Sequence, residues 1–183
     1  MCNGKPKILC ITPTLHIKHY TLHKMNYRVG IGYDIHRLVK GRQLFLGGIQ
    51  IPSTKGLLGH SDADVLLHAL CDALLGAANA GDIGEHFPDH DPKYKNISSS
   101  VLLKKVAALL TRAHCKVNNI DIVVILEKPK LSPYKDAIRK KISDVLKIKV
   151  DAVSVKAKTN EGLDEIGKGN AVACYAVATL LVR

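Results

Sequence analysis

Three side chains in the first half of the sequence have the types and spacing of metal ligands. Asp34 and His36 lie two residues apart in a segment, 27–36, whose alternation predicts a strand, so both side chains would project from the same face. His68 follows on the second turn of a predicted helix. One carboxylate and two imidazoles suit zinc, manganese or a similar divalent cation, and three protein ligands leave a position open for a substrate. The pattern also fits a plain hydrogen bond between Asp34 and His36 with His68 packed in its helix, and spacing alone does not choose.

A phosphate-binding position is predicted beside these ligands. His60 and Ser61 lie where the helix is expected to begin, and Ser61–Asp64 has a capping-box-like spacing. The free N–H groups and the positive dipole end of a helix N-terminus favour an anion. An ordinary N-cap formed by Ser61 is the alternative. The helix is predicted from apolar residues at helical spacing: Val65, Leu66, Ala69, Leu70, Ala73, Leu74 and Ala77.

Three further segments carry polar groups that suit a sugar phosphate. In Gly81–Gly84, glycines flank Asp82 and let its backbone and carboxylate approach a hydroxyl group closely. Phe87–Pro92 is a second acidic loop. Lys158–Glu161 follows a predicted strand and offers a hydroxyl, an amide and a carboxylate, which suit a magnesium-bridged phosphate. Taken singly, each segment also fits a solvated turn.

The composition predicts one soluble domain with an N-terminal appendage. The chain has 183 residues, 46% of them hydrophobic, which is enough for a core without disulfide or metal staples. Its longest uncharged apolar run, Asn170–Val182, is shorter than the roughly 20 residues of a membrane span, so no membrane partner is expected. Residues 1–24 contain no acid. We interpret 1–24 as an extension that is disordered, a targeting segment or a result of a start upstream of Met25, and 25–183 as the functional domain.

Charge and cysteine content narrow the function classes. The formal net charge of +11 favours anionic partners such as phosphates or nucleic acid. Aromatic residues make up 4% of the chain, which is low for proteins that stack single-stranded bases on rings, so no nucleic-acid partner is expected. The five cysteines include no C-x-x-C pair. A disulfide framework is therefore not expected, and a reducing compartment fits best.

The predicted elements mix strands and helices without strict alternation. This order indicates an α+β single domain, with a mixed β-sheet and helices packed on one face, as in a ferredoxin-like variant. Strands are predicted at 27–36, 43–51 (a hairpin turning at Gly47 and Gly48), 120–126, 152–158 and 171–182, and helices from Ser61 to about 79, over 99–113 and from Ser132 onward.

In series, these motifs resemble the 2-C-methyl-D-erythritol 2,4-cyclodiphosphate synthases, enzymes of the non-mevalonate isoprenoid pathway. The similarity runs from about Tyr27 to Val182 and keeps both the order and the spacing of the motifs. The matching stretches are Gly30–His36, Gly56–Leu70, Gly81–Gly84, Phe87–Asp89, Pro129–Lys130 and Val155–Ala157 leading into Thr159 and Glu161. Each stretch occurs by chance elsewhere, but the whole series is specific.

The resemblance implies a metal-dependent cyclising lyase. It would convert 4-diphosphocytidyl-2-C-methyl-D-erythritol 2-phosphate to the 2,4-cyclodiphosphate and CMP. The nucleophile is the substrate's own 2-phosphate, so the protein would supply positioning and charge neutralisation. The family is a homotrimer with three interfacial active sites, which implies the same assembly here. It also implies the cytoplasm for a bacterial host or the plastid for a eukaryotic one.

Individual roles carry over from the family by position. The divalent ion, usually zinc, would be held by Asp34, His36 and His68. Glu161 would bind a second ion, magnesium or manganese, that bridges the substrate diphosphate. His60 and Thr159 would be the catalytic residues that stabilise the transition state. The full implied substrate-binding set is Asp34, Ile35, His36, His60, Ser61, Asp82, Ile83, Gly84, Phe87, Pro88, Asp89, His90, Asp91, Leu126, Glu127, Lys128, Pro129, Lys130, Leu131, Ser132, Lys158, Thr159, Asn160, Glu161 and Lys168.

The sequence departs from the family near the implied trimer axis. Family members often carry an aromatic residue, an arginine and a glutamate where this chain has Glu165, Lys168 and Asn170. Lys168 keeps the charge but lacks the bidentate fork of arginine. We therefore do not expect the central cavity to bind an isoprenoid diphosphate, as proposed for some relatives.

Two functions from other classes remain as alternatives. A metal-dependent phosphoesterase could use the same aspartate and histidines, but it would release inorganic phosphate. A basic RNA-binding module would bind independently of metal, and its binding would weaken steeply with salt.

Overall fold

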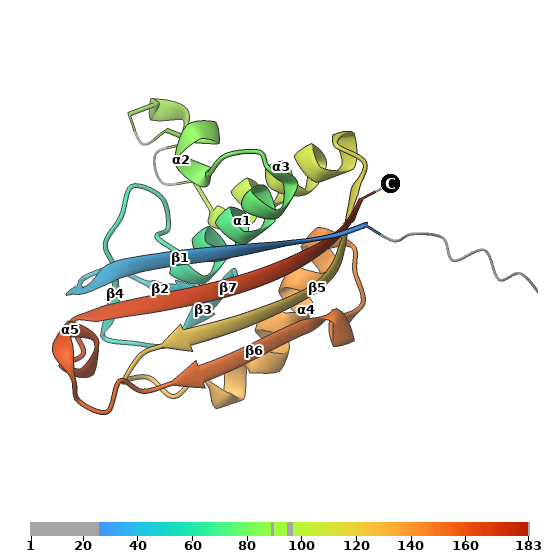
Figure 1. The fold of residues 1–183 in the computed structure, drawn as a ribbon. Coiled ribbons are helices and arrows are strands. Elements are labelled where there is room, and N and C mark those ends of the chain that lie inside the picture. The colour runs from blue at the N-terminus through green and yellow to red at the C-terminus, as the bar shows by residue number, and fades with distance from the viewer. Residues whose placement is uncertain (1–25, 89, 95–96, 183) are drawn as a thin grey trace, which may run out of the picture.

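A five-stranded mixed sheet forms the centre of the molecule in a computed structural model that describes residues 26–88, 90–94 and 97–182 (Figure 1). The strand order is β4-β1-β7-β5-β6, and β5 and β6 run parallel while the other neighbours are antiparallel. The strands of this sheet are β1 (Asn26–Lys40), β4 (Lys55–Leu57), β5 (Cys115–Ile125), β6 (Val153–Lys158) and β7 (Ala171–Val182), and a separate hairpin pairs β2 (Leu44–Leu46) with β3 (Ile49–Ile51).

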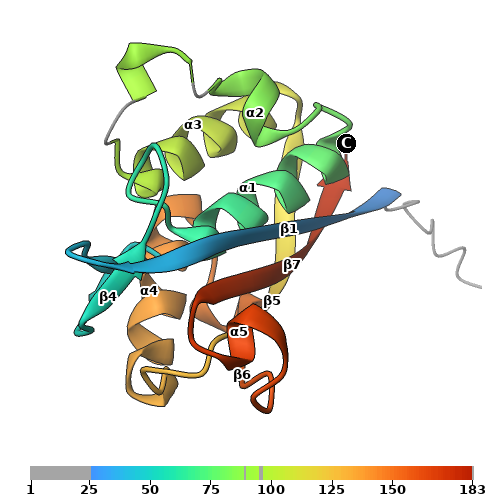
Figure 2. The ribbon, with the colours of Figure 1, turned by 90° about the vertical axis from the view of Figure 1, so that its left-hand side faces the viewer.

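Helices α1, α3 and α4 cover one face of the sheet, and within residues 26–88, 90–94 and 97–182 no helix layer covers the other face (Figures 1 and 2). The helices are α1 (Val65–Ala78), α2 (Ile83–His86), α3 (Ser99–Arg112), α4 (Lys135–Leu146) and α5 (Asp164–Gly167). Three single 3₁₀ turns occur at Pro92–Tyr94, Ser132–Tyr134 and Val150–Ala152. This arrangement confirms the predicted α+β single domain. None of the helices in the described ranges is long and apolar enough to cross a bilayer.

Strand β1 turns two very different faces to its surroundings. Its even-numbered residues face α1, and they include Gly30 and Gly32. A Cβ atom on either glycine would lie 2.0 Å from a carbonyl oxygen of α1, that of Ala73 or Ala69 respectively. The absence of a side chain at these two positions lets the helix lie directly on the strand.

The opposite face of β1 is apolar and open. Val29 is 67% exposed and Ile31 is 69% exposed. Tyr33 stacks at a tilt on Tyr175 of β7, with ring centroids 4.7 Å apart. A contiguous apolar sheet face of this kind is typical of an interaction surface.

A buried carboxylate fixes the start of α1, three residues later than the sequence predicted. Asp64, not Ser61, is the N-cap, and its side chain accepts the N–H of Leu67 at 3.1 Å. It also accepts the backbone N–H groups of Gly47 at 2.9 Å and Gly48 at 2.6 Å, in the predicted hairpin turn. Burial raises the pKa of Asp64, and these N–H groups oppose that shift. Asp64 thus ties the β2–β3 hairpin to α1.

The other boundaries agree with the predictions to within a few residues, with physical reasons for the differences. The run at 171–182 is a strand, as its β-branched content indicated. β5 begins at Cys115 instead of residue 120 because its polar first half pairs with the C-terminal end of β7. Ser132 and Pro133 form a 3₁₀ turn before α4. The short elements β4, α2 and α5 were not predicted, and the predicted extension at 1–24 lies outside the described residues.

We predict that Gly32→Ala pushes α1 away from β1 and lowers the free energy of unfolding by about 1–3 kcal/mol or more, as overpacking does. Gly76→Ala is the matched control, because Gly76 lies on the exposed side of α1 and its added Cβ would meet nothing within 4 Å. Alanine there should stabilise the helix by about 0.5–1 kcal/mol. Urea unfolding of both variants is the measurement, and equal stability of the two would contradict the close packing.

Candidate functional site

The three predicted metal ligands meet where β1 passes under α1. The Oδ2 atom of Asp34 lies 3.0 Å from Nε2 of His36 and 3.0 Å from Nδ1 of His68. The two ring nitrogens are 3.3 Å apart. All three ligand atoms lie within 4.8 Å of one another, so a single ion can contact all of them.

The outer nitrogen of His36 shows which way its lone pair points. Nδ1 of His36 lies 2.9 Å from the carbonyl oxygen of Leu58. A carbonyl only accepts hydrogen bonds, so Nδ1 carries the proton and the neutral ring presents the bare Nε2 to Asp34. A ring nitrogen without a proton and a carboxylate oxygen both carry lone pairs, so they repel each other unless a cation lies between them. The residues present therefore fit a divalent metal.

The same contacts determine the charge state of Asp34. Burial raises its pKa, but the neighbouring imidazoles of His36 and His68 lower it more, so the pKa falls well below its usual range. Asp34 is therefore ionised at neutral pH. The predicted alternative, a plain hydrogen bond between Asp34 and His36, describes the contact but not the convergence of His68 on the same oxygen.

A cavity of about 610 Å³ opens over the three ligands. This volume lies within the roughly 300–1,000 Å³ of small-molecule sites. Besides the three ligands, its lining consists of Leu58, Gly59, His60, Ser61, Asp72, Ile83, Gly84, Phe87, Pro88, His90, Tyr94, Ile97 and Leu102. Predicted residues from three separate segments thus share one wall with the metal ligands.

His60 and Ser61 line the cavity, but not as part of a helix N-terminus. The hydroxyl of Ser61 accepts the N–H of Ala63 at 3.1 Å, in a turn before α1. In α1, the N–H of Leu67 donates to the side chain of Asp64 and the N–H of His68 donates to its carbonyl. The prediction that His60 and Ser61 lie at the start of this helix is therefore wrong, because α1 begins at Val65. The Nε2 atom of His60 is buried and has no hydrogen-bond partner among the residues that the structure describes.

The Gly81–Gly84 segment forms the start of α2 instead of a loop. Asp82 is exposed and caps this helix by accepting the N–H of Glu85 at 2.9 Å. Ile83 and Gly84 reach the cavity, and the N–H of Ile83 donates to Asp72 at 2.8 Å. Burial raises the pKa of Asp72, although that N–H bond lowers it. Asp72 is a cavity residue that the sequence analysis did not select.

Three described residues of the second acidic loop, Phe87, Pro88 and His90, line the cavity. Phe87 packs edge-on against Tyr94 with ring centroids 5.4 Å apart, and Lys105 of α3 lies over both rings. Asp91 is bound to Lys93 at 2.5 Å on the outer side of the loop, and Asp89 lies outside the described residues.

The predicted cytidine-side segments meet one another but do not reach this cavity within one chain. Glu127 accepts the N–H of Asn160 at 2.7 Å, and the hydroxyl of Thr159 donates to Glu161 at 2.5 Å. None of the residues of these two segments is among the described residues that line the cavity. The residues concerned are Leu126, Glu127, Lys128, Pro129, Lys130, Leu131, Ser132, Lys158, Thr159, Asn160 and Glu161.

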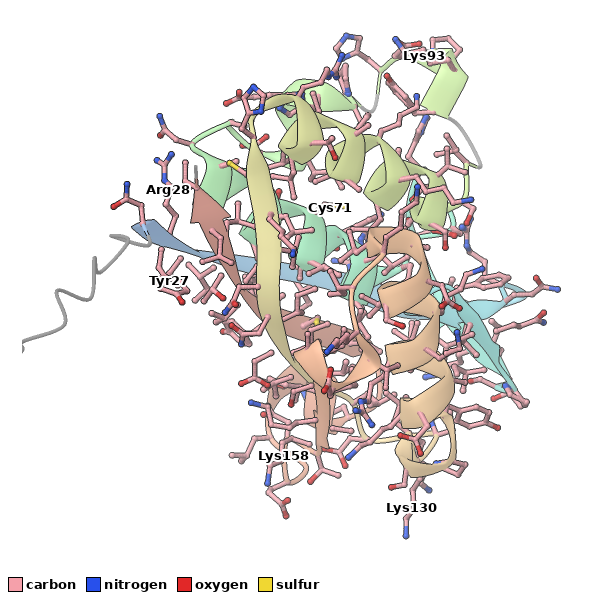
Figure 3. The ribbon with its side chains drawn as sticks, turned by 90° about the vertical axis from the view of Figure 1, so that its right-hand side faces the viewer. Tyr27, Arg28, Cys71, Lys93, Lys130 and Lys158 are labelled. Atoms are coloured by element: carbon pink, nitrogen blue, oxygen red, sulfur yellow. The ribbon has the colours of Figure 1, made fainter. Side chains whose placement is uncertain are left out.

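Figure 3 shows the separation of the two halves along the height of the molecule. Lys130 and Lys158 lie at its lower end, and Lys93, which follows the loop over the cavity, lies at the upper end, with Cys71 of α1 between them. Lys168, the remaining predicted residue, pairs with Glu165 at 2.8 Å, and Asn170 donates to the same carboxylate at 3.0 Å. The positive charge of Lys168 is therefore already paired with a carboxylate of the same chain.

Comparison with known proteins identifies relatives of this chain. The YgbB family model matches residues 27–181. A protein of Pelotomaculum thermopropionicum named 2-C-methyl-D-erythritol 2,4-cyclodiphosphate synthase is 59% identical over 151 residues, which cover 82% of this chain and 93% of that protein.

Two solved structures share the fold. The structure of the bifunctional IspDF from Campylobacter jejuni has a TM-score of 0.84 at 40% identity and matches 87% of this chain, which spans 43% of that longer chain. A CDP complex of IspF from Plasmodium falciparum has a TM-score of 0.76 at 36% identity, covering 86% of this chain and 97% of that one.

We predict that His68→Ala removes the bound metal, because two ligands remain at the site and one imidazole is lost. Metal content after dialysis should fall from about one ion per chain to near zero. His114→Ala is the control, since His114 is exposed at the end of α3 and lies outside the cavity. Full metal content in the His68 variant would contradict the ligand assignment.

Proposed function

The chain belongs to the YgbB family, and we propose that it closes the diphosphate ring of 2-C-methyl-D-erythritol 2,4-cyclodiphosphate. The observation that carries this proposal is twofold. This chain is 59% identical to a synthase of this name, and its three metal-ligand residues lie together in the lining of one cavity. The substrate is 4-diphosphocytidyl-2-C-methyl-D-erythritol 2-phosphate and the second product is CMP. The compartment, cytoplasm or plastid, stays a prediction.

The reaction transfers a phosphoryl group within one molecule. An oxygen of the 2-phosphate forms a bond to the β-phosphorus of the diphosphate, and the bond from that phosphorus to the bridging oxygen breaks. CMP leaves with the bridging oxygen and the electron pair. Because nucleophile and electrophile are tethered, the protein's task is to fold the substrate and to stabilise charge on the phosphoryl oxygens.

The described residues suit these tasks. His60 and Ser61 both line the cavity, where their side chains would contact phosphate oxygens. The cavity wall that would receive the methylerythritol hydroxyl groups consists of Asp72, Ile83, Gly84, Phe87, Pro88 and His90. Asp82 would approach the same hydroxyls from the start of α2.

Zinc is the proposed resident metal, because one carboxylate and two imidazoles with an open position are a donor set typical of catalytic zinc. When bound at Asp34, His36 and His68, the ion would polarise the diphosphate as a Lewis acid. Glu161 is the proposed ligand of a second, magnesium-like or manganese ion. Its carboxylate is exposed and is paired with Thr159, the proposed partner of His60 in stabilising the transition state.

The cytidine group is proposed to bind at 126–132 and 158–161. Support comes from the hydrogen bonds that join these segments, since Glu127 holds the backbone of Asn160 and the N–H of Leu126 donates to the carbonyl of Lys158 at 2.9 Å. A rigid pair of segments can recognise a base by its edges without aromatic stacking. The solved CDP complex of the Plasmodium falciparum relative also supports a cytidine diphosphate ligand.

A homotrimer is proposed because one chain does not bring the two halves of the site together. The cytidine-side segments do not line the metal cavity of their own chain. The open face of β1 and β7 exposes apolar side chains that a second copy would bury: Tyr27, Val29, Ile31, Tyr33, Ile35, Tyr175 and Val177. Packing three such faces around an axis would place the 126–132 end of one chain beside the cavity of its neighbour.

We predict that the purified chain converts the substrate to the cyclic diphosphate and an equal amount of CMP, followed by phosphorus NMR. Chelation should abolish turnover, and zinc with magnesium should restore it, because the phosphoryl charge is then neutralised again. Release of inorganic phosphate without CMP would instead favour the phosphoesterase. Inactivity of the folded, metal-loaded chain would contradict the proposed reaction.

We predict that the chain sediments at three times its 19.9 kDa mass. Ile31→Glu places a charge in the centre of the open sheet face and should shift the sedimenting species to the monomer. Val101→Glu is the control, because Val101 is an exposed apolar residue of α3 on the helical side. A wild-type monomer, or a trimer that survives Ile31→Glu unchanged, would contradict this assembly.

A further inference from the structure

We propose that Ser99 and Asp62 are positioning residues that hold the ring of His68 with its Nδ1 lone pair facing the metal site. This inference rests on the proposed metal site and extends it to two residues outside the ligand set. Neither residue touches the substrate cavity in the described lining. Both act on the metal through His68.

The three groups form a chain of short hydrogen bonds that leads away from the metal site. Oγ of Ser99 lies 2.9 Å from Nε2 of His68, the ring nitrogen opposite the one that faces Asp34. The same hydroxyl lies 2.5 Å from Oδ1 of Asp62. The backbone N–H of Ser99 donates to the other carboxylate oxygen, Oδ2, at 3.0 Å. Asp62 thus accepts two hydrogen bonds from Ser99, one from its hydroxyl and one from its backbone N–H.

Counting protons along this chain gives the orientation of the imidazole. An ionised carboxylate accepts only, so the single hydroxyl proton of Ser99 goes to Asp62. Ser99 then has only lone pairs to offer His68, and Nε2 of His68 must be the donor. In the neutral ring Nδ1 is therefore the bare nitrogen, which is the one aimed at Asp34 and His36. The hydroxyl of Ser61, 3.2 Å from Nε2, is a second acceptor for the same proton.

The packing makes this arrangement rigid. Ser99 is fully buried at the first residue of α3, directly after the N-cap Ser98. Asp62 lies in the turn before α1, and its Oδ1 also accepts the N–H of Asp64 at 3.3 Å. Three separate elements, the turn, α1 and α3, therefore meet at one imidazole. His36 is held by a backbone carbonyl instead, so the two ligands are oriented by independent contacts.

Removal of a carboxylate that orients a metal-binding histidine typically lowers metal affinity by about 10–100-fold. Here the carboxylate acts through a serine hydroxyl, so removal of either member should have a similar effect. The affinity for Zn²⁺, measured by competition with a chromophoric chelator, should fall about 10–100-fold in Ser99→Ala and in Asp62→Asn. Asparagine keeps an acceptor for the Ser99 N–H but replaces the acceptor of its hydroxyl with a donor.

A double variant tests whether Asp62 acts on His68 only through Ser99 or also independently of it. If Asp62 acts only through Ser99, Ser99→Ala combined with Asp62→Asn should lose no more Zn²⁺ affinity than Ser99→Ala alone. Ser100→Ala, one residue further along α3, and Asp151→Asn, an exposed acid in a 3₁₀ turn, are the matched controls and should bind Zn²⁺ within about twofold of wild type.

Nitrogen-15 NMR of the ring gives a readout that a purely structural role would not move. In the zinc-loaded wild type, the Nε2–H proton of His68 should be shifted downfield and protected from exchange by its bond to Ser99. In Ser99→Ala it should move upfield and exchange faster, with the backbone spectrum otherwise retained. If Ser99→Ala does not fold, Asp62→Asn carries the same test, because it keeps the backbone contact.

The outcomes distinguish this inference from the proposed function. Wild-type affinity and an unchanged His68 ring signal in both single variants would overturn the positioning role while leaving the metal site intact. Additive losses in the double variant would overturn the shared pathway. A wild-type chain that retains no Zn²⁺ would overturn the metal site itself, and the positioning role with it.

Discussion

The direct contact of helix α1 with strand β1 is the constraint on which the site depends. The contact exists because Gly30 and Gly32 carry no side chain where the helix backbone crosses them. It brings His68 of α1 to the same carboxylate oxygen that faces His36, with both nitrogens 3.0 Å from it. A larger residue at either glycine would separate the ligands before it disturbed any of them chemically. The glycines of the strand are therefore part of the metal site, although they touch no metal.

The remaining contacts hold this junction from outside. Asp64 joins the β2–β3 hairpin to the start of α1, the Leu58 carbonyl orients His36, and Ser99 and Asp62 are proposed to orient His68. The cavity is lined on one side by the three metal ligands. Ile83 and Gly84 of α2, together with Phe87, Pro88, His90 and Tyr94, also line it. On the other side of the sheet, none of the residues that the structure describes covers the exposed apolar face. An assembly of three copies would cover that face and complete each cavity with the cytidine-side segments of a neighbour.

The sequence predicted those parts of the fold that depend on local pattern. Alternation in 27–36 indicated a strand with Asp34 and His36 on one face, Gly47 and Gly48 indicated the hairpin turn, and the 171–182 run was correctly interpreted as a strand. The start of α1 was placed at Ser61 because the Ser61–Asp64 spacing imitates a capping box. In the structure Asp64 is the N-cap instead, because its carboxylate also accepts the N–H groups of the hairpin turn. That contact joins segments that are distant in the sequence.

The residues that sequence reasoning missed share one property. Asp72 and Ser99 gain their roles from tertiary packing, with Ser99 brought to His68 from 31 positions away by the packing of α3 beside α1. No spacing rule links such residues. The i, i+4 relation of His68 and Asp72 on α1 was the one available signal, since it places both on the same helix face. The separation of the two halves of the site likewise depends on the strand order β1-β7-β5-β6, which local pattern does not reveal.

The most direct test of the central claim is X-ray absorption at the zinc edge of the zinc-loaded chain. We expect a four-coordinate ion with light-atom ligands only, two of them giving the scattering pattern of imidazole at about 2.0–2.1 Å. One further ligand should be exchangeable, so that its shell changes when CDP is added. A sulfur shell at about 2.3 Å, or a single imidazole in a six-coordinate oxygen shell, would contradict a site built by Asp34, His36 and His68.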